Sequence, residues 1–377
     1  MRALRVAMVC PYSLSRPGGV QGQVLGLARA LRAAGHEAAV LAPVDGTAEV
    51  EGLEGEELVS LGRSVALPAN GSVAPVSLSP RAALRAISAV RAGGFDVLHF
   101  HEPLAPGPGY ACLFRCSQPK VGTFHRAGAG AAYRVLGPLA RWAAGHLDVR
   151  CAVSPEAMST AFGALGGSYE VVGNGVELER FSTAVPWATK GPTVMFVGRH
   201  ERRKGLGVLL DAWDRISGEA RRGAPAGEGA TLWVVGEGPQ TAELRRRHPP
   251  GPGLEWLGRI GDEDLASRMA GAHLLCAPAI AGESFGMVLV EAMAARTAVV
   301  ASDIPGYSFV GASHASLVPP GEREALAGAL SAGLADARSG TGTCAPEALD
   351  AAFDRARHWS MEALAARYVG LYGALVD

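Results

Sequence analysis

Two glutamates stand eight residues apart in the segment GESFGMVLVEAMAA, which otherwise has the composition of buried core. Charged side chains are seldom fully buried without a partner, so Glu283 and Glu291 are expected to bind something. HLLCAP predicts a strand, AIAGES its exit loop, and FGMVLVEAMAA the helix that follows. Glu283 therefore lies just before the helix, and Glu291 lies about five residues into it, roughly 8 Å further along the axis.

This separation favours one kind of carboxylate chemistry over another. A retaining glycosidase holds its two carboxyls only about 5 Å apart. Two more distant carboxylates suit hydroxyls at different ends of one elongated ligand, such as a sugar and a ribose. The helix start, Ser284, Phe285 and Gly286, offers backbone amides that can receive a phosphate between them. A nucleotide-sugar fits this description. The alternative is a capping residue and a buried salt bridge.

Four cations follow the predicted strand Thr193–Val197 in the segment VGRHERRKG. Arg199 and Lys204 lie just past the strand end, where a pyrophosphate would need positive charge. Arginine offers forked contacts and lysine a point charge. Arg202 and Arg203 between them are expected to be solvated. The alternative is that all four cations form a solvated face.

Other strand ends carry weaker signals. Gly18 and Gly19 in CPYSLSRPGG allow a ligand to approach the backbone at a helix start, although a Gly-Gly pair taken by itself favours a plain tight turn. Gly236 in VVGEGP indicates a nucleotide-facing turn. His125 in VGTFHR is either structural or catalytic. The acids of GDED at 261–264 fit the first turn of a helix better than a metal site.

These positions depend on strands that alternate with helices along the whole chain. Repeated βαβ units predict an α/β fold of two doubly wound, Rossmann-like domains that face a cleft, with ligands beyond the carboxyl ends of the strands. The expected strands are Arg5–Cys10, Glu37–Leu41, Val97–Phe100, Lys120–Thr123, Val149–Val153, Thr193–Val197, Thr231–Val235, Leu274–Ala277, Ala298–Ala301 and Ala315–Val318.

Length and composition set the class of protein. With 377 residues, the chain predicts domains at 1–172 and 173–350 and an amphipathic helical tail at 351–377. A net charge of −1 gives no indication of nucleic-acid binding. The six cysteines show no C-x-x-C pair, which favours a reduced, cytoplasmic protein. The apolar run at the N-terminus is too short for a signal peptide, and no segment approaches a membrane span.

Together these segments resemble the retaining glycosyltransferases of family 4, which have the GT-B fold. The E-x7-E spacing in GESFGMVLVEAMA carries the resemblance, and VGRHERRKG, VGNGVELERF, VVGEGP and WSMEALAARY extend it over nearly the whole chain. CPYSLSRPGGVQGQVLGLA, NGSVA, FDVLHFHEP, TFH and GGSYEVVGNGV are similar to an actinobacterial branch of that family. Members of that branch transfer mannose from GDP-mannose to the inositol ring of phosphatidylinositol at the cytoplasmic membrane face, without a metal.

The resemblance implies roles for individual residues. It implies that Glu283 contacts the mannose hydroxyls, that Glu291 contacts the ribose, and that His125 touches the sugar near its reacting carbon. It also implies that the diphosphate is bound by Gly19, Arg199 and Lys204, and that the inositol pocket is bordered by Tyr12, Gln21 and Asn70. The implied catalytic set is His125, Glu283, Arg199 and Lys204. The final helix would pack back on the first domain.

The acceptor side departs from the family pattern. Pro75 stands where the family has a basic residue, Ala69 where it has tyrosine, and RAGAGAAYR where it has a Ser/Thr run with lysine. Arg126 and Arg134 could replace the lost positive charge. Two alternatives therefore stay open: a family 4 enzyme that moves a UDP-linked sugar to another acceptor, such as an inositol phosphate, and a non-catalytic nucleotide-binding protein. An NAD-linked oxidoreductase would need G-x-G-x-x-G after the first strand, which is missing.

Overall fold

The computed structural model describes residues 2–16, 18–46, 57–69, 72–127, 137–221 and 227–376. Its contacts divide the chain into two compact units: unit 1 comprises Met1–Gly175 and Met361–Asp377, and unit 2 comprises Val176–Ser360. The first boundary follows residue 175, where 172 was expected. The chain returns to unit 1 at Met361, where 351 was expected, because helix α14 (Pro346–Arg357) still packs on unit 2.

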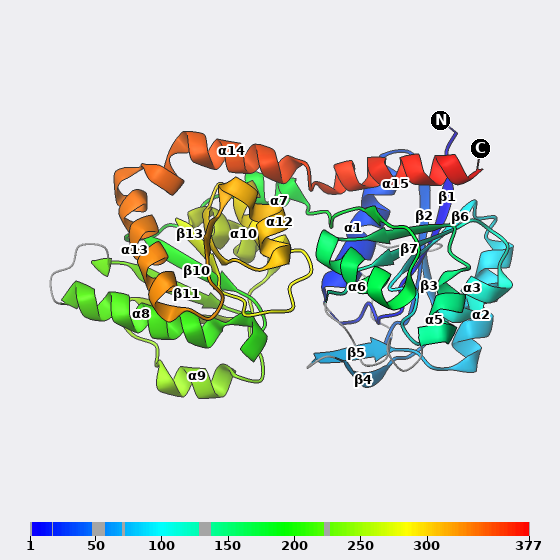
Figure 1. Cartoon of the computed structure of the whole chain (residues 1–377), viewed down its shortest axis with the longest axis horizontal. Helices are drawn as coiled ribbons and strands as arrows, with labels where there is room; N and C mark the ends of the chain where they lie inside the picture. The colour runs from blue at the N-terminus through cyan, green and yellow to red at the C-terminus, as the bar shows by residue number, and fades with distance from the viewer. Residues whose placement is uncertain are drawn as a thin grey trace. The chain divides into compact units, whose positions relative to one another are not determined.

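Unit 1 is built on a parallel sheet in the order β3-β2-β1-β6-β7-β8-β9 (Figure 1). The order reverses between β1 and β6, which makes this a doubly wound sheet. Its strands are β1 (Arg5–Val9), β2 (Glu37–Ala42), β3 (Leu58–Ser60), β6 (Val97–His101), β7 (Lys120–Phe124), β8 (Val149–Ala152) and β9 (Glu170–Val171). A separate antiparallel hairpin is formed by β4 (Val65–Ala69) and β5 (Ser72–Val76).

Helices cover both faces of the unit 1 sheet. They are α1 (Gly19–Ala33), α2 (Pro80–Ala92), α3 (Gly109–Arg115), α5 (Gly137–Ala144), α6 (Pro155–Leu165) and α15 (Met361–Val376). Alternate residues of β1 join different apolar clusters: Val6 and Met8 pack with α1 and α15, whereas Ala7 and Val9 pack with α2 and α3. A sheet that is covered on both faces must be apolar on both, which explains its nearly continuous hydrophobic strands.

Unit 2 repeats this architecture with a sheet in the order β12-β11-β10-β13-β14-β15. Its strands are β10 (Thr193–Val197), β11 (Thr231–Val235), β12 (Leu254–Gly258), β13 (Leu274–Ala277), β14 (Ala298–Ser302) and β15 (Ser316–Val318). Besides α14, its helices are α7 (Leu178–Ser182), α8 (Leu206–Arg221), α9 (Thr241–Arg247), α10 (Asp262–Gly271), α11 (Met287–Ala294), α12 (Pro305–Gly311) and α13 (Arg323–Ser339). Short 3-10 turns lie at η2 (Arg202–Lys204), η4 (Ala312–His314) and η5 (Gly342–Cys344).

The final helix completes the core of unit 1, as the family resemblance implied. Met361, Tyr368 and Tyr372 of α15 are buried in the same cluster as β1 and α1. The Tyr372 hydroxyl lies 2.7 Å from His99 Nδ1 on β6, so the helix is joined to the sheet by a buried hydrogen bond as well as by apolar contact.

Replacing Tyr372 with phenylalanine is expected to lower the free energy of unfolding by about 1–2 kcal/mol, because the ring stays packed while the buried His99 nitrogen loses its partner. Urea unfolding of wild type and variant measures this difference. Tyr372→Leu should cost more, since it also removes ring contacts. Equal midpoints for wild type and Tyr372→Phe would show that the hydrogen bond contributes nothing net.

Candidate functional site

A cluster of charged groups in unit 2 lies where the strand order reverses. β10 and β13 are neighbours at the centre of the sheet, and the remaining strands extend from them in opposite directions. The loops that follow such a pair form the usual ligand site of an open α/β sheet. The segment Arg199–Lys204 follows β10, and Glu283 lies in the loop after β13.

Ion pairs connect these two loops in one chain. Lys204 Nζ lies 2.6 Å from Glu283 Oε1, and Arg203 Nη1 lies 2.8 Å from the same oxygen. Arg203 Nε is also 3.0 Å from Glu201 Oε2, and the other oxygen of Glu201 is 2.8 Å from Arg199 Nε. The structure therefore brings Lys204 to Glu283 directly, and links Arg199 to them through Glu201 and Arg203.

Two residues of this ion-pair series, Arg203 and Glu201, differ from what the sequence predicted. The expectation that Arg203 is merely solvated is wrong, because it binds carboxylates on both loops. Glu201 was not singled out, yet its side chain is only 9% exposed and holds two arginines. The sequence pattern that could have identified Glu201 is an acidic residue among cations just after a predicted strand. Arg202 is exposed, as expected.

Glycines allow the loops of unit 2 to lie this close. Gly205 has φ +72°, and a Cβ there would lie 1.8 Å from the carbonyl oxygen of Pro278 in the β13 loop. Gly236 has φ +112°, and a Cβ there would lie 2.1 Å from the oxygen of Gly198. Gly236 is thus required by packing between the β11 and β10 loops. Its predicted contact with a nucleotide stays a prediction.

Glu291 lies in α11, with its carboxyl in a charged neighbourhood. Burial raises the pKa of Glu291 to about 7; the Arg180 and Lys204 cations lower it, and the Asp262 carboxylate raises it further. Arg180 Nη1 in turn lies 3.1 Å from Asp262 Oδ2. A glutamate that titrates near neutral pH can either accept or donate a hydrogen bond to a ligand hydroxyl.

The start of α11 is shaped by its buried neighbours. The Phe285 ring is 1% exposed and lies against Phe309 and Trp359, so only its backbone is available to a ligand. Gly286 precedes the helix at φ +99°. Ser284 is half-buried beside it. The predicted donor contacts of these three residues therefore rest on backbone amides and the serine hydroxyl.

The acids of GDED take the place that the sequence predicted. Asp262, Glu263 and Asp264 form the first turn of α10, where negative charge is favourable. Among the residues that the structure describes, no group of three or more His, Cys, Asp or Glu side chains is arranged to hold a metal ion.

In unit 1 the polar groups gather at the ends of β6 and β7. The backbone N–H of His125 donates to Glu102 Oε1 at 2.7 Å. Burial raises the pKa of Glu102 to about 7, against hydrogen bonds from the amides of His125 and Arg126 and the charge of Arg126, which lower it. Glu102 also adopts φ +48°, which is unusual for a residue with a side chain. The sequence interpretation missed Glu102, although HFHEP places it directly after a buried strand.

The other residues predicted for the acceptor lie nearby or outside the described chain. Burial raises the pKa of the half-buried Tyr12, and the Glu102 carboxylate adds to that rise. Gln21 Nε2 donates to the carbonyls of Ser13 and Arg16 at 3.3 and 3.2 Å, so this side chain braces the loop between β1 and α1.

Gly19, Asn70 and Arg134 are the remaining predicted positions. Gly19 begins α1, at the carboxyl end of β1, and the extended Gly18 before it gives the helix no side-chain cap. Asn70 and Arg134 lie outside the described residues.

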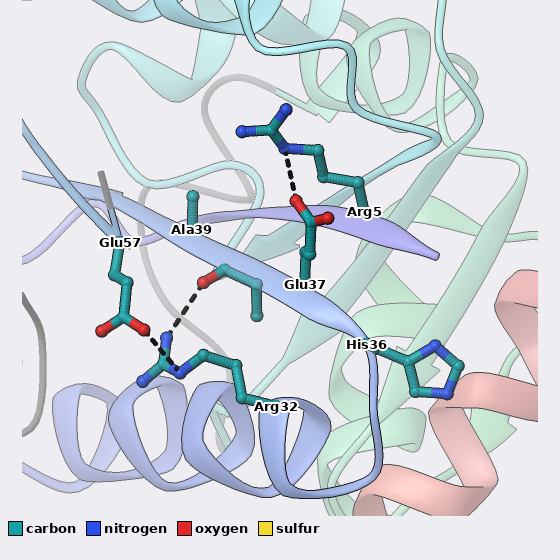
Figure 2. Close-up of a pocket in the computed structure, with 7 residues that line it drawn as sticks. Arg5, Arg32, His36, Glu37, Ala39 and Glu57 are labelled. Carbon is teal, nitrogen blue, oxygen red and sulfur yellow. Dashed lines mark hydrogen bonds and ion pairs between the residues drawn. The ribbon is translucent and has the colours of Figure 1, made fainter. Parts of the chain in front are cut away.

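A cavity of about 350 Å³ lies at the opposite end of the unit 1 sheet (Figure 2). Its cations face carboxylates: Arg5 Nε lies 3.1 Å from Glu37 Oε2, and Arg32 Nε lies 3.3 Å from Glu57 Oε1. Since Arg5 and Glu37 begin their strands, this cavity is remote from the carboxyl strand ends.

The chain is similar to described families and proteins over most of its length. The family model "Glycosyltransferase Family 4" matches residues 17–180, and "Glycosyl transferases group 1" matches residues 191–336. The chain is 38% identical to the phosphatidyl-myo-inositol mannosyltransferase of Mycolicibacterium smegmatis, over 87% of this chain and 84% of that protein. It is 39% identical to the protein of the same name from Mycobacterium leprae, over 87% and 86%.

The fold is also that of a solved glycosyltransferase. The crystal structure of a glycosyltransferase from Rickettsia africae matches with a TM-score of 0.76 at 16% identity, over 99% of each chain. At that identity the likeness concerns the fold alone.

Proposed function

Because this chain belongs to glycosyltransferase family 4 and is a hexosyltransferase, we propose that it transfers mannose, with retention, from GDP-mannose to the inositol ring of phosphatidylinositol. Unit 2 would bind the nucleotide-sugar and unit 1 the acceptor. The identity to phosphatidyl-myo-inositol mannosyltransferases over most of the chain supports the sugar and the acceptor class. The guanosine base is the part of the proposal that rests on resemblance alone.

The linked ion pairs of unit 2 are the structural observation that best supports sugar transfer from a diphosphate donor. A departing diphosphate needs cations that are already in place, since preorganised charge costs no rearrangement during the reaction. Glu201 holds Arg199 and Arg203, and Glu283 holds Arg203 and Lys204, so these cations form one linked array. In this proposal those side-chain cations, and not a metal ion, balance the charge of the leaving group.

The chemical step follows from what the site contains. The transition state would have oxocarbenium character at the sugar carbon, and the leaving phosphate would accept the proton of the attacking inositol hydroxyl on the same face. Such a path needs no protein nucleophile. Glu283, released from Lys204 by the incoming phosphate, would accept hydrogen bonds from sugar hydroxyls, and Glu291 would do the same for the ribose.

The lipid acceptor implies contact with a membrane surface, at its cytoplasmic face. No described helix is long and apolar enough to span a bilayer. The contact proposed here is a peripheral one. Helix α2 supports it, because Arg81, Leu84 and Arg85 are exposed together on one amphipathic helix. A helix with basic and apolar exposed residues can lie in the interface of an anionic membrane.

Thermal unfolding with GDP, UDP, ADP and NAD, each at the same millimolar concentration, tests the donor. We expect GDP to raise the midpoint most, because a ligand at 100 times its dissociation constant stabilises the folded state by about 2.7 kcal/mol. GDP-mannose with phosphatidylinositol vesicles then tests the acceptor. A larger shift with UDP would overturn the guanosine donor and favour a family 4 enzyme for another sugar. A GDP shift without transfer to vesicles would leave the donor standing and overturn the lipid acceptor.

A further inference from the structure

Polar side chains form two rungs between β6 and β7 in unit 1. Alternate residues of a strand point to the same face, so His99 and His101 share a face with Thr123 and His125. His99 Nε2 lies 2.7 Å from Thr123 Oγ1, and His101 Nδ1 lies 3.0 Å from His125 Nε2. All four side chains are buried.

The first rung is satisfied by hydroxyl groups. His99 uses Nε2 on Thr123 and Nδ1 on the hydroxyl of Tyr372, and the hydroxyl of Tyr368 lies 2.7 Å from Thr123 Oγ1. A hydroxyl can both donate and accept, so either tautomer of His99 can be accommodated. This rung therefore joins α15 to the sheet without imposing a proton position.

The second rung, His101 and His125, contains no hydroxyl group, and it does fix the position of a proton. Burial lowers the pKa of His101 well below its usual range and lowers that of His125 to about 4, so both rings are neutral near pH 7. A neutral imidazole has one N–H and one acceptor nitrogen. One of the two facing nitrogens must therefore carry the proton, and the other must accept it.

The second nitrogen of the His101 ring decides which of the two facing nitrogens carries the proton. His101 Nε2 is buried and has no partner among the described residues. An unpartnered buried N–H is rarer than an unpartnered acceptor, so the proton of His101 belongs on Nδ1.

We propose that His101 is a positioning residue for sugar transfer: its Nδ1–H donates to His125 Nε2 and thereby keeps the His125 proton on Nδ1. The inference rests on the proposed function in one respect, namely that His125 touches the sugar. His101 itself touches no substrate. Its role is to fix the ring plane and the tautomer of its neighbour.

This arrangement has a use in the proposed reaction. The sugar carbon gains positive charge in an oxocarbenium-like transition state, and an imidazolium beside it would repel that charge. A His125 ring whose acceptor nitrogen is already occupied by a donor is held neutral. Stabilisation of the departing diphosphate is then left to the cations of unit 2.

Nitrogen-15 NMR of the ligand-free protein, labelled at histidine, tests the tautomer directly. Protonated and unprotonated ring nitrogens differ widely in chemical shift, and the His125 signals are identified by their loss in His125→Gln. We expect a protonated Nδ1 and an unprotonated Nε2 at pH 7. The reverse assignment in wild type would overturn the proposal without any variant at His101.

A matched pair of variants tests the effect on transfer. His101→Phe keeps a ring but no donor, whereas His101→Asn keeps an N–H near the place of Nδ1. His101→Phe is expected to release the His125 tautomer and to lower kcat about 10- to 100-fold, by analogy with the loss seen when a residue that orients a metal-bound histidine is changed, with little change in KM. His101→Asn is expected to restore the tautomer and most of the kcat.

Each outcome separates this inference from the proposed function. An unaltered His125 tautomer in a folded His101→Phe protein, or failure of His101→Asn to restore both measurements, would overturn the positioning role. Absence of transfer by the wild-type protein from every nucleotide-sugar would instead overturn the proposed function. The tautomer measurement needs no substrate, so it still decides the hydrogen-bond assignment in that case.

Discussion

Alanine in place of Lys204 is expected to lower kcat/KM for sugar transfer about 100- to 1,000-fold, the loss typical of one preorganised donor to a developing negative charge. Lys204 Nζ is 2.6 Å from Glu283 Oε1, so the variant loses a phosphate cation and also releases the carboxylate proposed to bind the sugar. Initial rates over a range of GDP-mannose concentrations measure the effect. Both kcat and KM should change, because the donor and the transition state each lose a charge contact.

Arg202→Ala is the matched control for this prediction. Arg202 lies two residues away, is exposed, and makes no ion pair with the described residues. The Arg202→Ala substitution removes the same charge as Lys204→Ala. Because Arg202 lies outside the ion-pair series, its expected effect on transfer is small. Arg203→Ala should fall between the two, since it breaks the link between Glu201 and Glu283 without removing the proposed phosphate contacts. Equal losses for Arg202→Ala and Lys204→Ala would indicate a general field effect and contradict the assigned site.

Mild acid is expected to unfold unit 1. Burial lowers the pKa of His99 to about 3, of His125 to about 4, and of His101 well below its usual range. The unfolded chain binds protons on these residues below about pH 6.5, whereas the folded unit does not. Stability is therefore lost as pH falls, by up to about 4 kcal/mol per pH unit for three groups. Between pH 6.5 and 5 this loss approaches the whole stability of a typical domain.

Hydrogen exchange at stepwise lower pH can follow β6 and β7 separately from β10 and β13. We expect protection in unit 1 to fall first. Full protection of β6 and β7 at pH 4 would contradict the prediction. Glu102 acts in the opposite sense, because its folded pKa of about 7 makes the folded state bind a proton that the unfolded chain releases between pH 4.5 and 7. Glu102→Gln should therefore gain stability at pH 8 and show a steeper loss on acidification.

Strands buried on both faces were the most predictable part of the fold. The ten expected strands are present with ends that shift by at most one residue, because apolar β-branched runs flanked by turn residues leave few alternatives. β12 was missed since LEWLG mixes glutamate and tryptophan, as suits an edge strand that is only half covered. The hairpin β4–β5 was missed because each of its strands contains a proline, Pro68 or Pro75, which is unusual within a strand.

The site was predictable in its members but not in its connections. The sequence placed Arg199, Lys204 and Glu283 at strand ends. It could not show that Arg203 joins both loops, because the neighbour of a side chain depends on how two loops pack after β10 and β13 are aligned. Glu102 escaped notice for a related reason: its partners, the amides of His125 and Arg126, follow the neighbouring strand β7 and have no side-chain signature.

Helix α15 also fixes when unit 1 can form. Tyr368 and Tyr372 belong to its core, yet they follow all of unit 2 in the chain. A ribosome that adds about 5–20 residues per second releases the continuous unit 2 before it releases α15. The N-terminal part of unit 1 is therefore synthesised first, and the apolar surface that α15 covers stays uncovered until unit 2 has been made. A stop codon at position 361 would keep every residue of unit 2 and deprive unit 1 of part of its core.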